Sequence, residues 1–163
     1  TLYRGTYNLF SHTLTELGIE IRFAARNDIA GMAALIDQRT KAQAVAPYQL
    51  AQHGLRPVWA SDDGSKGYHG TAVALFDHLV QSGKLDGSRI AVYGCGPEPM
   101  MSALAKVCGM RGTYCEVSLE RSMPCGYGVC MGCVVQGRDR SGYETFRRVC
   151  RDGPVFDAST IVF

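Results

Sequence analysis

Along the chain, the spacing of the apolar residues alternates several times between the period of a helix and the period of a strand. Spacings of three and four residues predict helices over residues 6–17, 28–36, 48–53, 71–81 and 99–108. Two-residue alternation or a short apolar run predicts strands over residues 19–24, 40–45, 58–60, 90–93 and 113–119. Proline opens the helix at Pro99, and glycine ends it at Gly109. The pattern predicts an α/β fold, with a mostly parallel sheet, flanking helices and a small cysteine-bearing module after it.

Four cysteines near the C-terminus have the ligand spacing of a plant-type [2Fe-2S] cluster. Cys125, Cys130 and Cys133 form a C-x4-C-x2-C run, and Cys150 follows after sixteen further residues. A loop that supplies three thiolates has to turn tightly, and glycines within the run allow this turn. These glycines are Gly126, Gly128 and Gly132. The grouping of three plus one favours an iron-sulfur cluster.

Two other interpretations of the four cysteines remain open at this point. A structural zinc site also accepts four thiolates, although it usually takes them as two short pairs. The thiols could also bind nothing. Disulfides are less favoured, because seven cysteines is an odd number and the sequence shows no secretory signal. Cys108 and Cys115 fall on apolar positions, where we expect buried thiols that act as small hydrophobic groups.

Composition narrows the range of partners. The net charge is +2, and the 17 Lys and Arg residues are spread along the chain without a run, which excludes an electrostatic footprint for nucleic acid. No apolar stretch approaches the roughly 20 residues of a membrane-spanning helix. A hydrophobic content of 46% is sufficient for a core. Reduced thiols without a signal peptide indicate a cytoplasmic protein.

A second candidate site follows two of the predicted strands. Gly94, Cys95, Gly96 and Pro97 lie where the strand at 90–93 runs into a helix, a place where ligands bind in open α/β sheets. The adjacent pair Asp62 and Asp63 follows the strand at 58–60, and carboxylates at such an end can bind ribose hydroxyls. A tight turn explains each segment equally well without a ligand.

Residues from about 46 to 163 resemble the electron-transfer subunit of NAD-dependent dihydroorotate dehydrogenase, a member of the ferredoxin-reductase-like flavoproteins. The resemblance rests on residues 60–65, 93–101, 117–121, 125–133 and 148–157. It implies that Cys125, Cys130, Cys133 and Cys150 bind the cluster. It also implies that residues 94–97 border a nicotinamide, with Asp62 and Asp63 near the same site. In this family the cluster relays electrons between an FAD in its own subunit, served by NAD(H), and the FMN of a catalytic partner subunit in pyrimidine biosynthesis.

The sequence departs from that family in its first part. A flavin-binding β-barrel and a first glycine-rich loop are both missing, so we expect NAD(H) binding to be weak and FAD to have no domain that holds it. Residues 1–45 instead resemble a segment of a PLP-dependent O-acetylhomoserine sulfhydrylase, with Tyr3 at the position that stacks on the cofactor ring. We therefore expect a chimeric chain with a junction near residues 43–48.

The sequence as a whole predicts three segments and one leading function. We expect an αβα segment over 1–45, a partial NAD-binding domain over 46–118 and a [2Fe-2S] module over 119–163. The leading function is an iron-sulfur electron carrier that is not a complete catalyst alone. The alternative is a non-catalytic α/β scaffold whose cysteines bind zinc or nothing. A PLP enzyme is disfavoured, because none of the lysines lies in a context that resembles a Schiff-base site.

Overall fold

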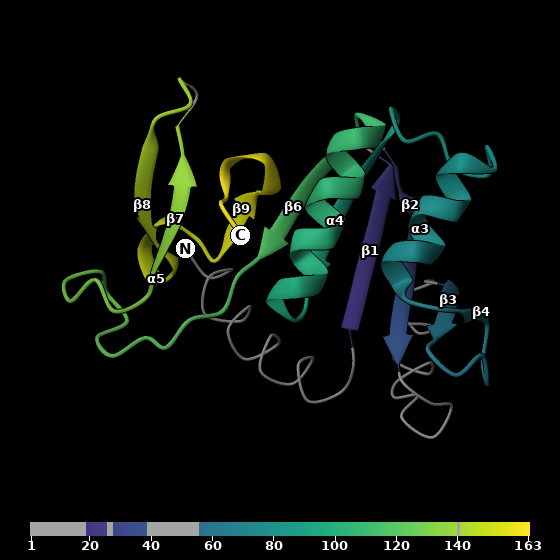
Figure 1. The fold of residues 1–163 in the computed structure, drawn as a ribbon, viewed down its shortest axis with the longest axis horizontal. Helices are drawn as coiled ribbons and strands as arrows, with labels where there is room; N and C mark the ends of the chain where they lie inside the picture. The colour runs from purple at the N-terminus through teal and green to yellow at the C-terminus, as the bar shows by residue number, and fades with distance from the viewer. Residues whose placement is uncertain (1–18, 26–27, 39–55, 140) are drawn as a thin grey trace.

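In the computed structural model of the protein, residues 19–25, 28–38, 56–139 and 141–163 are described. Seven strands form the main sheet in the order β4-β3-β2-β1-β5-β6-β9, and β7 pairs with β8 in a second, two-stranded sheet (Figure 1). The strands of the main sheet are β1 (Ile19–Ala25), β2 (Asp28–Gln38), β3 (Arg56–Ser61), β4 (Tyr68–His69), β5 (Ile90–Cys95), β6 (Tyr114–Ser118) and β9 (Val155–Asp157). The second sheet consists of β7 (Val134–Arg138) and β8 (Glu144–Arg148).

The main sheet is mixed, and the expectation of a mostly parallel sheet is not confirmed. Strand β1 pairs antiparallel with both β2 and β5, and β9 pairs antiparallel with β6. The pairs β2–β3, β3–β4 and β5–β6 are parallel. The connection between β1 and β2 has only two residues, which is too short for a parallel crossover and imposes a hairpin. Strands β2 to β6 nevertheless share one direction, so their carboxyl ends lie at one edge of the sheet.

Strand β2 occupies the segment for which the apolar period predicted a helix over residues 28–36, and that prediction is wrong. The strand pairs along both of its edges, with β1 on one side and β3 on the other. A short segment that is mostly apolar fits the helical and the strand period equally well. Backbone pairing with two neighbouring strands then favours the strand. The elements expected over 6–17, 40–45 and 48–53 lie outside the described residues, as does Tyr3.

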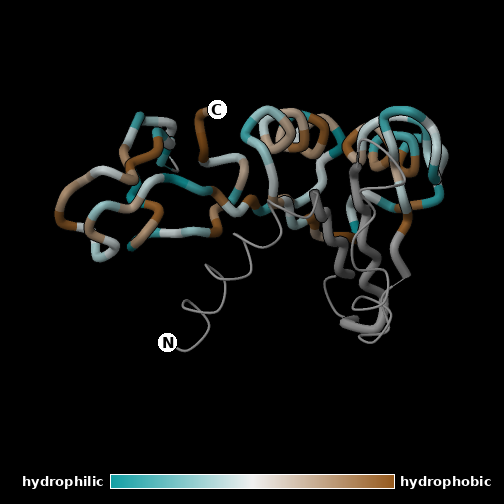
Figure 2. Tube along the Cα trace, turned by 90° about the horizontal axis from the view of Figure 1, so that it is seen from below, coloured by the Kyte–Doolittle hydropathy of each residue, from teal (hydrophilic) through white to brown (hydrophobic). Residues whose placement is uncertain are grey.

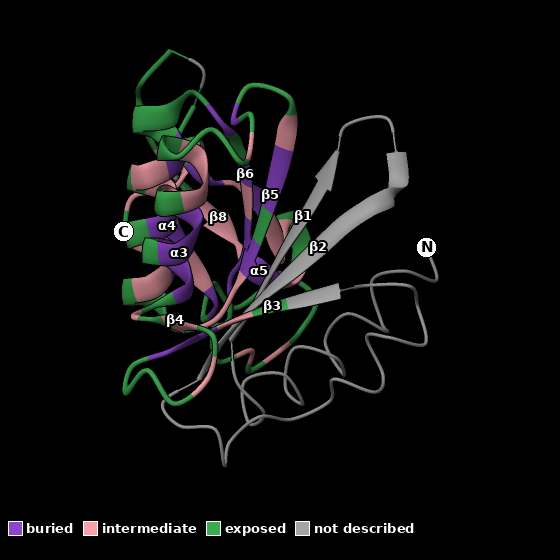
Figure 3. Ribbon diagram, turned by 90° about the vertical axis from the view of Figure 1, so that its right-hand side faces the viewer, coloured by how far each residue is buried: buried purple, intermediate pink, exposed green. Residues whose placement is uncertain are grey.

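Two helices, α3 (Ala72–Gln81) and α4 (Glu98–Arg111), lie on the same face of the main sheet (Figures 2 and 3). The side chain of Thr71 caps α3 by accepting a hydrogen bond from the Ala74 N–H at 3.2 Å. Helix α4 continues through Gly109, where we expected it to end, and stops at Gly112, which has a left-handed φ of 65°. Neither helix is long and apolar enough to cross a membrane, nor is any other helix in the described part of the chain.

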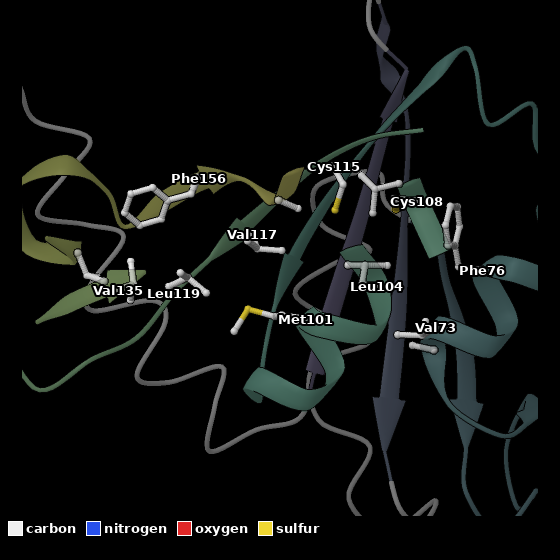
Figure 4. Packing of buried hydrophobic residues seen from close by; sticks show 14 of the residues in the cluster. Val73, Phe76, Met101, Leu104, Cys108, Cys115, Val117, Leu119, Val135 and Phe156 are labelled. Atoms are coloured by element: carbon white, nitrogen blue, oxygen red, sulfur yellow. The ribbon is translucent and has the colours of Figure 1, made fainter. Parts of the chain in front are cut away.

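The core fills the space between the two helices and the sheet (Figure 4). Its largest fully buried side chains include Phe76 from α3, Leu104 from α4 and Val117 from β6. Cys108 and Cys115 are buried here as expected. The hydrogen bond that the Cys115 thiol donates to Cys108, together with burial, raises the pKa of Cys115, which therefore stays protonated.

The C-terminal segment shares this core. After β7 and β8, a short helix α5 (Val149–Asp152) leads into β9, and a 3-10 turn, η2 (Ala158–Thr160), follows. Val135, Val149 and Phe156 are buried in the same cluster as the residues of α3 and α4. The backbone N–H of Leu119 also donates to the carbonyl of Pro154 at 3.0 Å. Burial and strand pairing thus attach residues 119–163 to the main sheet.

Candidate metal centre

The cysteine loop of residues 125–133 is held against the start of α5 by backbone and side-chain hydrogen bonds. The Val149 N–H donates to the carbonyl of Cys133 at 3.1 Å. The Cys150 N–H donates to the Cys133 Sγ at 3.4 Å. The guanidinium of Arg148 donates to the carbonyl of Gly128 at 2.9 Å. These bonds bring the fourth cysteine of the motif to the loop that carries the other three.

The four thiols lie in two contacting pairs, Cys125 with Cys130 and Cys133 with Cys150. Backbone N–H donation from Cys130 and Tyr127, followed by the Cys130 side chain, lowers the pKa of Cys125 to about 6. Donation from the Cys150 N–H lowers the pKa of Cys133. The hydrogen bond with Cys133 raises the pKa of Cys150, and the nearby charge of Cys125 contributes to this shift. One thiol of each pair thus favours the thiolate that binds iron.

The pairing fits a two-iron cluster better than a single metal ion. Each iron of a [2Fe-2S] cluster takes two protein ligands, so two pairs of thiols match the two irons. Within residues 58–139 and 141–163, no group of three or more Cys, His, Asp or Glu side chains that could hold a metal ion is found, so the thiols meet as pairs.

Two glycines and one methionine in the loop have the left-handed backbone that the tight turn requires. Gly126 has φ 72° and Gly128 has φ 90°. Met131 has φ 57°, a conformation that side chains other than glycine rarely adopt. Gly132 is required for a different reason, because a Cβ atom there would lie only 2.9 Å from the Pro124 side chain. The N–H of Gly132 donates to the Cys130 Sγ at 3.3 Å. The loop therefore directs its N–H groups toward sulfur, as an anionic cluster requires.

The loop lies at the surface of the protein. Cys130 is exposed, while Cys133 is buried. Around Cys130, the apolar side chains of Tyr127, Val129 and Met131 are 72%, 72% and 47% exposed. A redox group held in this loop would lie at the surface, under side chains that a partner protein can contact.

The second candidate site lies at the carboxyl end of β5, where Gly94 and Cys95 are the last two residues of the strand and Gly96 and Pro97 connect it to α4. Gly94 is buried, and a Cβ atom there would lie 2.5 Å from the Leu104 side chain, so the glycine permits close packing of the helix on the strand. Cys95 and Gly96 are half-buried, and Pro97 is exposed. Packing of the helix on the strand alone accounts for Gly94.

The N-terminus of α4 is poorly suited to a pyrophosphate. Pro97 caps the helix and Pro99 lies in its first turn, and neither has an N–H to donate. Glu98 adds a negative charge to the same turn and forms an ion pair with Arg121 at 2.9 Å. An anion at this helix end would meet a carboxylate in place of free donors.

Asp62 and Asp63 lie at the same edge of the sheet, at the end of β3, but not beside residues 94–97. Strands β2 and β1 separate β3 from β5, which corresponds to about 14 Å across the sheet. Both carboxylates are exposed in a tight turn. Hydrogen bonds from the side chain and the backbone N–H of Ser65 lower the pKa of Asp63, and the N–H bond measures 2.9 Å. The structure thus brings the four cysteines onto one loop and one adjacent helix, as two pairs, and separates Asp62 and Asp63 from residues 94–97.

Comparison with known proteins first shows the fold. The solved structure of an NADH-dependent reduced ferredoxin-NADP oxidoreductase superposes with a TM-score of 0.64 and 24% identity, over 80% of this chain and 44% of that one. At this identity the match shows the fold alone, which is ferredoxin-reductase-like. Residues 120–162 match the family model described as the iron-sulfur cluster binding domain of dihydroorotate dehydrogenase B.

Several relatives are electron transfer subunits of dihydroorotate dehydrogenase B (NAD(+)). The subunit from Caldanaerobacter subterraneus subsp. tengcongensis is 39% identical over 65% of this chain and 40% of its own length. The subunit from Bacillus caldolyticus is 40% identical over 76% and 44%. A probable subunit from Thermoplasma volcanium is 35% identical over 79% and 45%. The resemblance found in the sequence is confirmed, and the chain spans less than half the length of these relatives.

The likeness to these relatives extends further upstream than we expected. A match over 129 residues of a 163-residue chain begins no later than residue 35, whereas we placed a junction near residues 43–48. The matches thus continue across the proposed junction. The likeness of residues 1–45 to a PLP-dependent enzyme stays a prediction.

Proposed function

We propose that this chain is the cluster-bearing part of an iron-sulfur electron carrier, with one [2Fe-2S] cluster bound by Cys125, Cys130, Cys133 and Cys150. The observation that carries this proposal is the pairing of Cys125 with Cys130 and of Cys133 with Cys150 on one loop and one short helix. The family match of residues 120–162 supports the same ligand set. Such a cluster accepts and releases single electrons when bound.

The residues around the cysteines would stabilise the negative charge of the cluster and give a partner protein access to it. The N–H groups of Tyr127, Val129, Gly132 and Cys150 face the sulfurs and stabilise negative charge on them. The exposed side chains around Cys130 form the contact surface through which electrons leave or enter. By analogy with its relatives, we propose that the partner is the FMN-containing catalytic subunit of a dihydroorotate dehydrogenase in the cytoplasm. In this role the chain serves pyrimidine biosynthesis as one component of an oxidoreductase.

We further propose that residues 46–118 are part of a ferredoxin-reductase-type NAD-binding domain and that residues 119–163 are the cluster module. The fold match supports this division, as does the end of β6 at Ser118. Residues 94–97 would border a nicotinamide, with Asp62 and Asp63 along the same edge. The weak anion site at α4 argues that the nucleotide is held poorly by the described residues alone.

Metal and sulfide analysis of protein purified without oxygen tests the proposed function. We expect two irons and two acid-labile sulfides per chain and a brown-red colour. One zinc per chain, without sulfide and without colour, would replace the electron carrier by a structural zinc protein. Protein that contains neither metal would leave the alternative of a non-catalytic scaffold.

A further inference from the structure

Arg148 joins the two segments that carry the cysteines. Its Nη1 donates to the carbonyl of Gly128 at 2.9 Å, in the middle of the cysteine loop. Its Nε donates to Asp152 Oδ2 at 3.3 Å, and its backbone N–H donates to the same oxygen at 2.8 Å. The guanidinium is thereby fixed at one end by a carboxylate and directed at the loop with the other. None of these contacts involves a sulfur.

The carbonyl that Arg148 contacts belongs to a peptide group that faces a sulfur. The Gly128 carbonyl and the Val129 N–H are two ends of one peptide group, and the Val129 N–H faces the Cys125 sulfur. On the other side of the glycine, the Gly128 N–H faces the Cys150 sulfur. A hydrogen bond accepted by a carbonyl polarises its peptide group and strengthens the bond that the N–H donates. Arg148 therefore acts on Cys125 through the backbone.

We propose that Arg148 is a positioning residue that fixes and polarises the Gly128–Val129 peptide group against the Cys125 sulfur and so raises the reduction potential of the cluster. The inference rests on the proposed function, because it requires the four cysteines to hold a [2Fe-2S] cluster. Reduction adds a negative charge to the cluster, and stronger N–H donation to sulfur stabilises the reduced form more than the oxidised form.

The surroundings of Arg148 indicate that its effect on the cluster comes from the directed hydrogen bond to Gly128 more than from its positive charge. Asp152 lies against the guanidinium and offsets its charge as seen from a distance. The Arg148 side chain is only 25% exposed, which limits its freedom to move away from the loop. At Gly128, a Cβ atom would lie 3.0 Å from the side chain of Arg151, so little space is left for the loop to shift. A lysine carries the same charge but cannot donate to Gly128 and Asp152 from a planar group.

Three variants of the full chain, loaded with cluster, test this inference by redox titration monitored by electron paramagnetic resonance. Arg148→Gln removes the charge and the guanidinium that donates to Gly128. Arg148→Lys keeps the charge but lacks the planar guanidinium. Arg147→Gln removes the same charge from the neighbouring position of β8, whose side chain points to the opposite face of the strand and lies near Gly137.

We expect Arg148→Gln to make the cluster tenfold harder to reduce. For one electron, this tenfold change in the reduction equilibrium lowers the reduction potential by about 59 mV. Arg148→Lys should move the potential in the same direction by at least half as much. Arg147→Gln should change the reduction equilibrium by less than threefold. If Arg148→Gln does not retain its cluster, the comparison of Arg148→Lys with Arg147→Gln carries the test.

Two results would overturn the inference. The first is an unchanged potential in the Arg148 variants, and the second is an equal shift in Arg147→Gln, which would show that any nearby charge suffices. Both leave the proposed function intact, because the cluster is present in these measurements. Absence of iron and sulfide from the unaltered chain would instead reject the proposed function itself.

Discussion

The backbone N–H of Cys150 donates to the sulfur of Cys133 at 3.4 Å, so the last cysteine of the motif lies against the third. Seventeen positions separate the two residues in the sequence, and the hairpin of β7 and β8 fills the interval. The hairpin returns the chain to its starting point, where the Val149 N–H donates to the Cys133 carbonyl. The second sheet therefore has a clear structural role, which is to bring the fourth cysteine to the loop.

Replacement of single cysteines should separate ligands from bystanders. We expect Cys130→Ser and Cys150→Ser each to lose most of the visible absorbance, because a serine hydroxyl is a poor ligand for iron in a thiolate site. Cys95→Ser is the matched control, since Cys95 is half-buried like Cys150 but lies at the end of β5. The control should keep its absorbance. Unchanged absorbance in Cys130→Ser would remove Cys130 from the ligand set.

Gly128→Ala should release the cluster faster than Gly126→Ala. Both glycines have left-handed backbones, so alanine at either position costs roughly 1–2 kcal/mol of backbone strain. Only at Gly128 would the new Cβ also meet the Arg151 side chain, at 3.0 Å, while Gly126 faces open space. The half-time of absorbance loss in the presence of an iron chelator measures the difference. Equal half-times would show that the contact with Arg151 has no effect on the site.

Thr113→Val should stabilise the fold. The hydroxyl of Thr113 is buried and has no hydrogen-bond partner among the described residues, and valine has the same shape without the polar atom. Removal of an unpaired buried hydroxyl is expected to raise the free energy of unfolding by about 1 kcal/mol.

Thr160→Val provides the control for that prediction. The Thr160 hydroxyl donates to the carbonyl of Asp157 at 2.8 Å, so the same substitution there should lower the free energy of unfolding by about 1 kcal/mol. Urea unfolding of the three proteins measures both changes. A loss of stability in Thr113→Val would mean that its hydroxyl has a partner such as a buried water.

The four-cysteine motif is recognisable in the sequence because ligand spacing is a local property, and its role as a cluster site stays a prediction. C-x4-C-x2-C followed by a distant cysteine determines which thiols can meet, independently of the rest of the fold. Strands β1, β3, β5 and β6 were also found from their apolar patterns. The pattern gave no signal for β7 and β8, in which polar residues such as Arg138 and Arg148 alternate with few apolar ones.

Features that depend on tertiary contacts could not be predicted. Strand β1 runs antiparallel to its neighbours because only two residues connect it to β2. This hairpin could not be predicted, because the apolar spacing of residues 28–36 predicted a helix there. The contact of Arg148 with Gly128 joins residues 20 positions apart and has no motif of its own. The separation of Asp62 from Gly94 likewise depends on the order of strands in the sheet.

The chain should bind NADH weakly and should not be reduced by it. Calorimetric titration is expected to show no saturation in the micromolar range, because Glu98 and two prolines occupy the helix end that a pyrophosphate would need. A hydride carries two electrons, and a one-electron centre requires a flavin to divide them. The cluster absorbance should therefore persist when NADH is added to flavin-free protein. A clear micromolar isotherm, or rapid bleaching by NADH alone, would contradict this expectation.

Electron paramagnetic resonance of the chemically reduced protein tests the central claim most directly. One electron added to a [2Fe-2S] cluster leaves one unpaired spin, and the oxidised cluster is silent. We predict a signal that integrates to one spin per chain after reduction with dithionite, that is absent before reduction, and that disappears in Cys130→Ser. A protein that gives no signal after reduction while retaining four free thiols or one zinc would contradict the assignment of Cys125, Cys130, Cys133 and Cys150 as ligands of a [2Fe-2S] cluster.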